Sequence, residues 1–162
     1  MIDNIPFKEF QMALPWIKAW HRVRCTLNFA RPLGDLLLRL WVAHAFWISG
    51  VAKTQSWDST LYLFENEYAV PLLSPEAAAY LGTAVELIFP VLLVIGFLGR
   101  FAALVLFLFN LVAVTSYPDL GAVGIEQHKV WGLMLLVSLL HGPGRLSVDH
   151  FLWRRWLNDS AP

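Results

Sequence analysis

Hydrophobic positions along the chain gather in four long stretches, at residues 33–53, 75–99, 100–118 and 121–142. Each is close to the roughly 20 residues that an α-helix needs to cross the hydrocarbon core of a bilayer. Apolar residues occupy the whole helical circumference of these stretches, whereas a helix of a soluble bundle is apolar along one stripe. The pattern predicts an all-α membrane protein, a bundle of four transmembrane helices, in preference to a soluble helical bundle.

The segments that flank these stretches have a mixed pattern. Residues 1–32 alternate aromatic and basic positions, which predicts an amphipathic helix at the cytoplasmic interface, interrupted near Pro15. Residues 57–75 form a long aromatic-rich connection in which we expect a short helix over the outer mouth of the bundle. The chain therefore divides into an interfacial segment (1–32), a four-helix membrane domain (33–150) and a cytoplasmic tail (151–162).

Basic residues set the expected orientation. Placing both termini in the cytoplasm leaves two of the 12 basic residues outside, Lys53 and Lys129. The other ten then lie in or near the inner side: Lys8, Lys18, Arg22, Arg24, Arg31, Arg39, Arg100, Arg145, Arg154 and Arg155. Lysine and arginine near membrane ends favour the cytoplasm, so we expect a multi-pass protein with both termini inside.

Composition excludes several classes of protein. Apolar residues make up 57% of the chain and charged residues only 15%, which agrees with lipid as the main solvent. The 12 basic and 12 acidic residues balance, so nothing indicates a nucleic-acid partner. Cys25 is the single cysteine, which excludes an intrachain disulfide and a multi-cysteine metal site. The first residues lack the pattern of a cleavable signal peptide.

Polar side chains inside the predicted spans are costly in lipid, and four of them are candidates for function: His44, Glu86, Asn110 and His128. Glu86 needs a proton or a partner, and His44, His128 and Lys53 are the candidates at a reachable depth. Glu86 and His128 are the predicted catalytic pair, which would relay protons to a bound redox molecule such as a quinone. The same side chains could instead hydrogen-bond helices together, and this packing role is favoured for His44 and Asn110.

Other residues are candidates for binding or for structure. Lys53, Trp57 and Tyr68 would shape the mouth of a ligand site, with Trp131 beside His128, and His44 is a further candidate ligand contact. Asp35 and Arg39 lie four apart on one helical face and predict a structural ion pair.

Cofactor and enzyme motifs are sparse. Histidines 44 and 128 could bind a haem axially, but their depths match poorly, so haem is less expected than a quinone. No metal site is predicted, because His44, Glu86 and His128 have no characteristic spacing. No GxSxG, P-loop, HExxH or CxxC motif is present, so no autonomous catalytic motif is identified.

Three segments carry a resemblance to a known family. They are LLRLWVAHAFWISGVAK (37–53), YAVPLLSPEAAAYLGTAVELIFPVLLVIGFLGR (68–100) and HGPGRLSVD (141–149). Their order and spacing resemble DoxX-type membrane proteins, which are related to the small subunit of thiosulfate:quinone oxidoreductases. The resemblance implies a four-helix fold in a bacterial inner membrane and an association with redox chemistry and stress responses. By this resemblance, the matching positions include Arg39, Ser49, Gly50, Lys53, Glu86, Gly96, Arg100 and the segment 142–145.

Two functional hypotheses follow. The first is a redox-associated inner-membrane subunit of a quinone-linked oxidoreductase, which binds a quinone or small electron carrier in the outer half of the bundle. The alternative is a non-catalytic anchor or assembly subunit of a redox or metal-stress complex. Both imply protein partner subunits or a homo-oligomer in the bilayer. A small transporter or metal-handling protein is a third reading, which only the mid-membrane polar groups favour.

Overall fold

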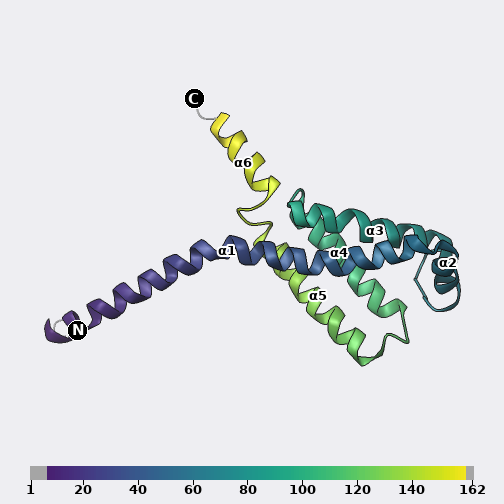
Figure 1. Ribbon diagram of the computed structural model, residues 1–162, viewed down its shortest axis with the longest axis horizontal. Coiled ribbons are helices and arrows are strands. Elements are labelled where there is room, and N and C mark those ends of the chain that lie inside the picture. The colour runs from purple at the N-terminus through teal and green to yellow at the C-terminus, as the bar shows by residue number, and fades with distance from the viewer. Residues whose placement is uncertain (1–6, 160–162) are drawn as a thin grey trace. The chain divides into compact units, whose positions relative to one another are not determined.

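The computed structural model describes residues 7–159, and its secondary structure there is entirely helical (Figure 1). Six helices follow one another: α1 (Phe7–Gln55), α2 (Trp57–Asn66), α3 (Pro75–Ile95), α4 (Gly99–Ser116), α5 (Gly121–His141) and α6 (Val148–Asp159). The chain divides into two compact units, one up to Gly34 and one from Asp35 onward. The all-α prediction is confirmed, and every residue of the candidate site lies in the second unit.

The first unit is the N-terminal part of α1. The helix continues through Pro15 and Pro32, so the predicted interruption near Pro15 is wrong. Proline removes one main-chain hydrogen bond from a helix, and the turns on either side of each proline keep theirs. Between positions 16 and 31 every side chain is exposed, including Trp16, Trp20 and Phe29. Residues 1–6 of the expected interfacial segment lie outside the described residues.

In the part of the chain that the structure describes, three helices are long and apolar enough to cross a membrane: the part of α1 from Trp16 to Gln55, α3 and α4. The fourth predicted span corresponds to α5, which has a suitable length of 21 residues. The consecutive polar residues from Glu126 to Lys129 lower the hydropathy of α5, which explains why α5 is less apolar than these three helices. A fourth crossing therefore stays a prediction.

The core of the second unit lies between α1, α3, α4 and α5. It contains buried side chains from all four helices: Val42, Ala43, Phe46, Leu93, Ala102, Ala103, Leu106 and Leu135. Alanine and glycine at helix interfaces let the backbones approach closely, as is common between helices in membranes. Large apolar side chains also cover the outer faces of α3 and α4, among them Tyr80, Leu81, Ile88, Phe101 and Leu108. This outward apolar surface suits contact with lipid.

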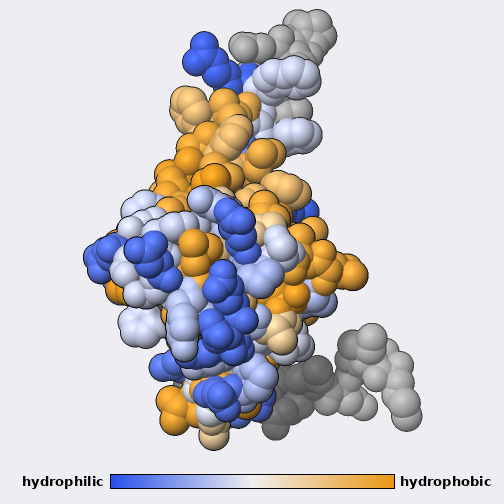
Figure 2. All heavy atoms as spheres, turned by 90° about the vertical axis from the view of Figure 1, so that its right-hand side faces the viewer, coloured by the Kyte–Doolittle hydropathy of each residue, from blue (hydrophilic) through white to orange (hydrophobic). Residues whose placement is uncertain are grey.

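One end of this bundle carries polar side chains. Figure 2 shows hydrophilic residues gathered on the side that faces the viewer, where α2 lies, with hydrophobic residues around them. Asp58, Glu65 and Glu67 in and beside α2 are exposed there. This contrast between a polar end and apolar flanks fits a bundle whose α2 end meets water.

Arg39 organises the opposite end of the bundle. Its side chain is 1% exposed, and its Nη1 donates to the main-chain oxygens of Leu93 at 3.1 Å and Val94 at 3.0 Å. Its Nη2 donates to the oxygen of Leu146 at 2.7 Å. A single guanidinium thereby joins the end of α3 to the segment between α5 and α6.

The predicted ion pair of Arg39 with Asp35 differs from the structure. The Nε of Arg39 donates to the main-chain oxygen of Asp35 at 3.3 Å, and no salt bridge joins the two side chains within the described residues. The five N–H donors of a guanidinium can satisfy several carbonyls at helix ends, where main-chain oxygens lack partners. The direct hydrogen bonds of the arginine side chain therefore go to main-chain carbonyls.

The turn between α3 and α4 uses left-handed backbone at Gly96 (φ 67°) and Leu98 (φ 49°). A Cβ atom on Gly96 would lie 2.4 Å from the Cβ of Ser147, so glycine is required there by space as well as by φ. Asp149 closes the turn, because its carboxylate accepts from the main-chain N–H groups of Leu98 at 2.9 Å and Gly99 at 2.8 Å. The start of α6 thus caps the first turn of α4.

Candidate functional site

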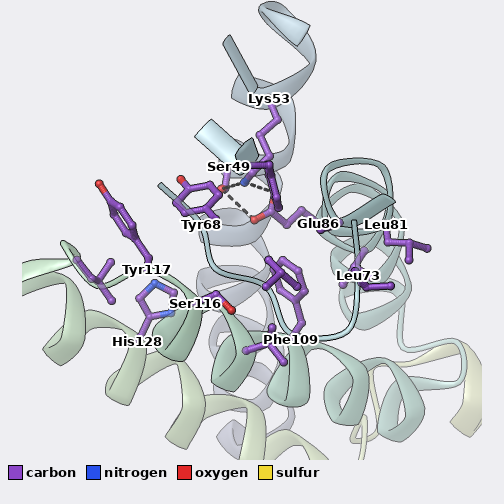
Figure 3. Close-up of a pocket in the computed structure, with 18 residues that line it drawn as sticks. Ser49, Lys53, Tyr68, Leu73, Leu81, Glu86, Phe109, Ser116, Tyr117 and His128 are labelled. Carbon is purple, nitrogen blue, oxygen red and sulfur yellow. Dashed lines mark hydrogen bonds and ion pairs between the residues drawn. The ribbon is translucent and has the colours of Figure 1, made fainter. Parts of the chain in front are cut away.

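A cavity of about 400 Å³ opens near the α2 end of the bundle (Figure 3). Its wall comes from α1, α2, α3, α4, α5 and the connection between α2 and α3. Most of the lining is apolar, and seven lining residues carry polar side-chain atoms: Ser49, Lys53, Tyr68, Glu86, Ser116, Tyr117 and His128. An apolar cavity with a few convergent polar groups is the usual form of a small-molecule site.

Lys53 and Glu86 form an ion pair on one wall of the cavity. The Nζ of Lys53 lies 2.6 Å from Oε2 of Glu86 and also donates to the Oγ of Ser49 at 2.8 Å. The Ser49 hydroxyl in turn donates to Oε1 of Glu86 at 3.0 Å. Figure 3 shows the three side chains converging from α1 and α3. Both carboxylate oxygens of Glu86 are therefore satisfied, which explains how a glutamate is held within a membrane-spanning helix.

Local sequence explains this convergence. Ser49 and Lys53 lie four residues apart, and therefore on one face of α1. Gly50 lets α1 approach α3, because a Cβ at this position would lie 2.9 Å from Cδ2 of Leu87 and 3.0 Å from Cβ of Glu86. The close approach of the two backbones brings the lysine and serine within hydrogen-bond distance of the carboxylate.

His128 belongs to a second polar pair, with Asn110. The Nδ1 of His128 lies 2.8 Å from Oδ1 of Asn110, and the Nδ2 of Asn110 donates to the main-chain oxygen of His128 at 3.0 Å. Asn110 is 2% exposed, and the imidazole ring packs edge-on against Trp131 at a centroid distance of 4.9 Å. These contacts fix the ring of His128 on the wall of the cavity.

Aromatic rings form another part of the wall. Tyr68 packs edge-on against Phe64 at 4.9 Å and against Tyr117 at 5.0 Å between ring centroids. Burial raises the pKa of the Tyr68 hydroxyl, and the nearby Tyr117, Glu67 and Glu86 raise it further. Tyr68 is therefore a neutral hydroxyl at physiological pH, able to donate a hydrogen bond.

The structure brings together four of the residues singled out in the sequence. Lys53, Tyr68, Glu86 and His128 all line this cavity (Figure 3). Of the three partners considered for Glu86, Lys53 is the one in contact with it. Whether Glu86 and His128 act in catalysis stays a prediction.

Three other candidates lie elsewhere. Trp57 packs against Tyr80 at a centroid distance of 4.6 Å and does not line the cavity. The ring of Trp131 packs against the ring of His128. Trp131 also lines a different, more open groove, which His44 lines as well. Because the His44 side chain is exposed and lines that other groove, the structure does not bring His44 and His128 to one cavity.

Sequence reasoning missed part of the site. Ser116 and Tyr117 lie at the end of α4, where a Ser-Tyr-Pro sequence marks the end of a span and gives no sign of a ligand wall. The packing role favoured for Asn110 fits its bonds to His128, although its partner was not identifiable from spacing. Within the described residues, no group of three or more histidine, cysteine, aspartate or glutamate side chains is placed to hold a metal ion.

Comparison with known proteins assigns the chain to a family. Residues 34–118 match the sequence pattern of DoxX, and residues 77–161 match that of DoxD, the TQO small subunit. The chain belongs to the DoxX family. The DoxX match includes the whole of α3 and α4 and the part of α1 that carries Ser49 and Lys53.

Two curated proteins are similar to the chain over most of its length. An uncharacterized protein of Haemophilus influenzae is 32% identical over 123 residues, which is 70% of this chain and 80% of that protein. CatD of Bacillus subtilis, described as a candidate oxidoreductase, is 29% identical over 131 residues, 79% of this chain and 93% of CatD. No solved structure matches the chain.

Proposed function

We propose that this DoxX-family protein is a redox-associated membrane subunit whose cavity binds a quinone or a similar small electron carrier. The observation that carries the proposal is the Lys53–Ser49–Glu86 network on one wall of a mostly apolar cavity of about 400 Å³. The description of CatD as a candidate oxidoreductase supports redox chemistry, and the DoxD match supports a role as a subunit.

The donors on Lys53 suit an oxygen ligand. A lysine ammonium has three N–H donors, and two of them are used by Ser49 and Glu86. The third is available to a carbonyl or hydroxyl oxygen of a ligand. The contacts with Ser49 and Glu86 hold the ammonium group in place, so the donor is oriented before the ligand arrives.

The apolar and aromatic wall suits a flat ring. Phe64, Tyr68 and Phe109 line the cavity, and aromatic side chains pack favourably against a second ring at centroid distances of about 4.5–7 Å. In this proposal Lys53 binds one ring oxygen, His128 faces the other end of the ligand, and Glu86 and His128 exchange protons with it.

Quinone titration tests the proposal. Purified protein in lipid nanodiscs is titrated with decyl-ubiquinone and with menadione, and binding is followed by tryptophan fluorescence. We expect saturable binding by the wild type and at least about tenfold weaker binding by Lys53→Met, which removes a charged donor worth about 1.5–3 kcal/mol.

Lys129→Met is the matched control for that experiment. Lys129 also forms a 2.6 Å ion pair, with Glu126, but both side chains are more than half exposed and neither lines the cavity. We expect Lys129→Met to bind like the wild type. If the wild type shows no saturable binding, the proposed function is wrong.

A non-catalytic anchor or assembly subunit is the second candidate function. The exposed apolar side chains between positions 16 and 29, together with the match to a small subunit, favour it. This role predicts that deletion of residues 1–30 abolishes co-purification of partner proteins while Glu86→Gln retains it. The opposite result would favour the ligand-binding role.

We further propose that the protein lies in a bacterial inner membrane, that α5 is the fourth span and that both termini are cytoplasmic. Arg39 and Arg100 lie at the end of the bundle opposite α2, which agrees with the orientation predicted from basic residues. Cysteines introduced in the Cys25→Ser background at Glu65 and Arg154 test the orientation. An impermeant maleimide added to intact spheroplasts should label Glu65→Cys and leave Arg154→Cys unlabelled, and equal labelling would contradict it.

A further inference from the structure

Asn110 determines which nitrogen of His128 carries a proton. Its Nδ2 lies 3.0 Å from the main-chain oxygen of His128, and its Oδ1 lies 2.8 Å from Nδ1 of the same residue. A carbonyl oxygen only accepts hydrogen bonds, so the amide group that faces it must be the NH₂ donor. The amide oxygen of Asn110 then faces Nδ1, and a favourable contact between them requires a proton on Nδ1.

The proton on Nδ1 also determines the state of the other ring nitrogen, Nε2. A neutral imidazole carries one proton, so Nδ1–H leaves Nε2 as a hydrogen-bond acceptor. No hydrogen bond to Nε2 comes from any side chain that the structure describes, between positions 16 and 156. The ring lines the cavity, as Figure 3 shows for the labelled His128. The acceptor is therefore available to a ligand.

Ser116 is a second residue of the cavity lining with an unpartnered polar atom. Its side chain is 3% exposed, its Oγ has no hydrogen-bond partner among the described residues, and it lines the same cavity as His128. Buried hydroxyl groups in native proteins nearly always have a partner. Ser116 and His128 thus belong to the lining of one cavity, and each carries a polar atom without a partner in the described part of the chain.

We infer that Asn110 is a positioning residue that holds His128 as an acceptor toward the cavity, so that the site selects ligands with a hydroxyl donor at that end. This inference rests on the proposed function. A hydroquinone presents a hydroxyl that donates to Nε2, whereas the carbonyl oxygen of a quinone only accepts and would face the lone pair of Nε2. At the other end Lys53 donates equally well to a hydroxyl or a carbonyl oxygen. The cavity therefore favours the reduced form of the carrier.

Binding of both redox forms of one compound tests the selectivity. Full-length protein in nanodiscs is titrated anaerobically at pH 8 with decyl-ubiquinol and with decyl-ubiquinone, since an ordinary imidazole with a pKa of about 6.5 is neutral there. We expect the reduced form to bind about tenfold more tightly. Its hydroxyl makes one buried hydrogen bond to Nε2, whereas the carbonyl oxygen of the oxidised form would face the lone pair of Nε2. Asn110→Leu and His128→Phe should each bring the ratio of the two Kd values close to one.

Controls separate positioning from folding. Thr115→Val changes another polar residue of α4, whose hydroxyl bonds only to its own helix, and should keep the wild-type ratio. Nitrogen-15 NMR of histidine-labelled protein, with His128→Phe used for assignment, reads the tautomer directly and needs no ligand. We expect a protonated Nδ1 and an unprotonated Nε2, and Asn110→Leu should give a mixture of tautomers.

The outcomes are distinct. Equal Kd values for the two redox forms, or a wild-type His128 protonated on Nε2, would overturn the inference and leave the proposed function standing. Absence of saturable binding of either form would remove both. A selective wild type whose ratio survives in Asn110→Leu would show that Asn110 does not position the histidine.

Discussion

The ion pair between Lys53 and Glu86 leads to the most quantitative prediction. Replacing Lys53 by methionine keeps most of the apolar length of the side chain and removes the ammonium group. The carboxylate of Glu86, whose side chain is 7% exposed, then keeps one hydrogen bond, from Ser49. Because Ser49 and Lys53 are the two donors to this carboxylate in the described part of the chain, loss of Lys53 forces Glu86 to take a proton or recruit water, and either change costs free energy.

The structure sets the expected magnitude. Removing one partner of a fully buried pair costs about 3–5 kcal/mol. The Lys53 side chain is 17% exposed, so water weakens the pair, and protonation of Glu86 limits the loss. We expect Lys53→Met to lower the free energy of unfolding by about 2–3 kcal/mol. For a chain of this length, that corresponds to a fall in Tm of roughly 5–10 °C.

A double-mutant cycle is the assay. The Tm values of the wild type, Lys53→Met, Glu86→Gln and the double variant are measured in one detergent by intrinsic fluorescence. Since each single variant strands one member of the pair, the double variant should be less destabilised than the sum of the two, by about 1–2 kcal/mol. Lys129→Met, which breaks an exposed pair, should change the free energy of unfolding by less than about 0.5 kcal/mol.

Additive effects would refute this reasoning. If the double variant loses the sum of the two single losses, the lysine and the carboxylate do not stabilise one another. A loss for Lys129→Met equal to that for Lys53→Met would also contradict it, because burial would then make no difference to the two pairs.

Three further predictions concern the end of the bundle opposite α2, and each is measured as a change in Tm. Arg39→Met strands buried main-chain carbonyls and should cost about 3 kcal/mol or more, whereas Asp35→Asn should cost less than about 0.5 kcal/mol, because the arginine contacts the main chain of Asp35. Gly96→Ala meets a Cβ contact of 2.4 Å and should be much more destabilising than Gly121→Ala, which has a similar positive φ and open space around it. Asp149→Ala removes the cap of α4 and should cost about 0.5–2 kcal/mol, and no measurable change would contradict the cap.

The helical fold was predictable because its signal is local. Runs of about 20 apolar residues specify a membrane-crossing helix by themselves, since the bilayer core leaves main-chain groups no partner outside the helix. The polar positions inside those runs were equally visible, which is why Glu86 and His128 stood out before their surroundings were known. Pro15 shows the limit of such rules, because a proline lowers helix propensity without ending α1.

The partners of these polar groups were not predictable from spacing. Lys53 lies 33 residues from Glu86, and which residue reaches the carboxylate depends on the rotation of α1 against α3 and on the space left by Gly50. His44 occupies the same helix as Lys53 but faces outward. The position of a residue along its helix therefore predicted its depth in the membrane, but it did not predict which side chains that residue contacts.

Sequence alone determined that the chain folds into long apolar helices, that it belongs with lipid, and that a glutamate and a histidine lie inside the bundle. Those properties depend on the free energy of moving side chains and main-chain groups from water into lipid. Each residue contributes to that free energy separately. The tertiary structure decided that Lys53 contacts Glu86, that Asn110 contacts His128, and that Lys53, Glu86 and His128 line one cavity. Such contacts depend on how the helices rotate and pack against one another, and small residues distant in the sequence set that packing.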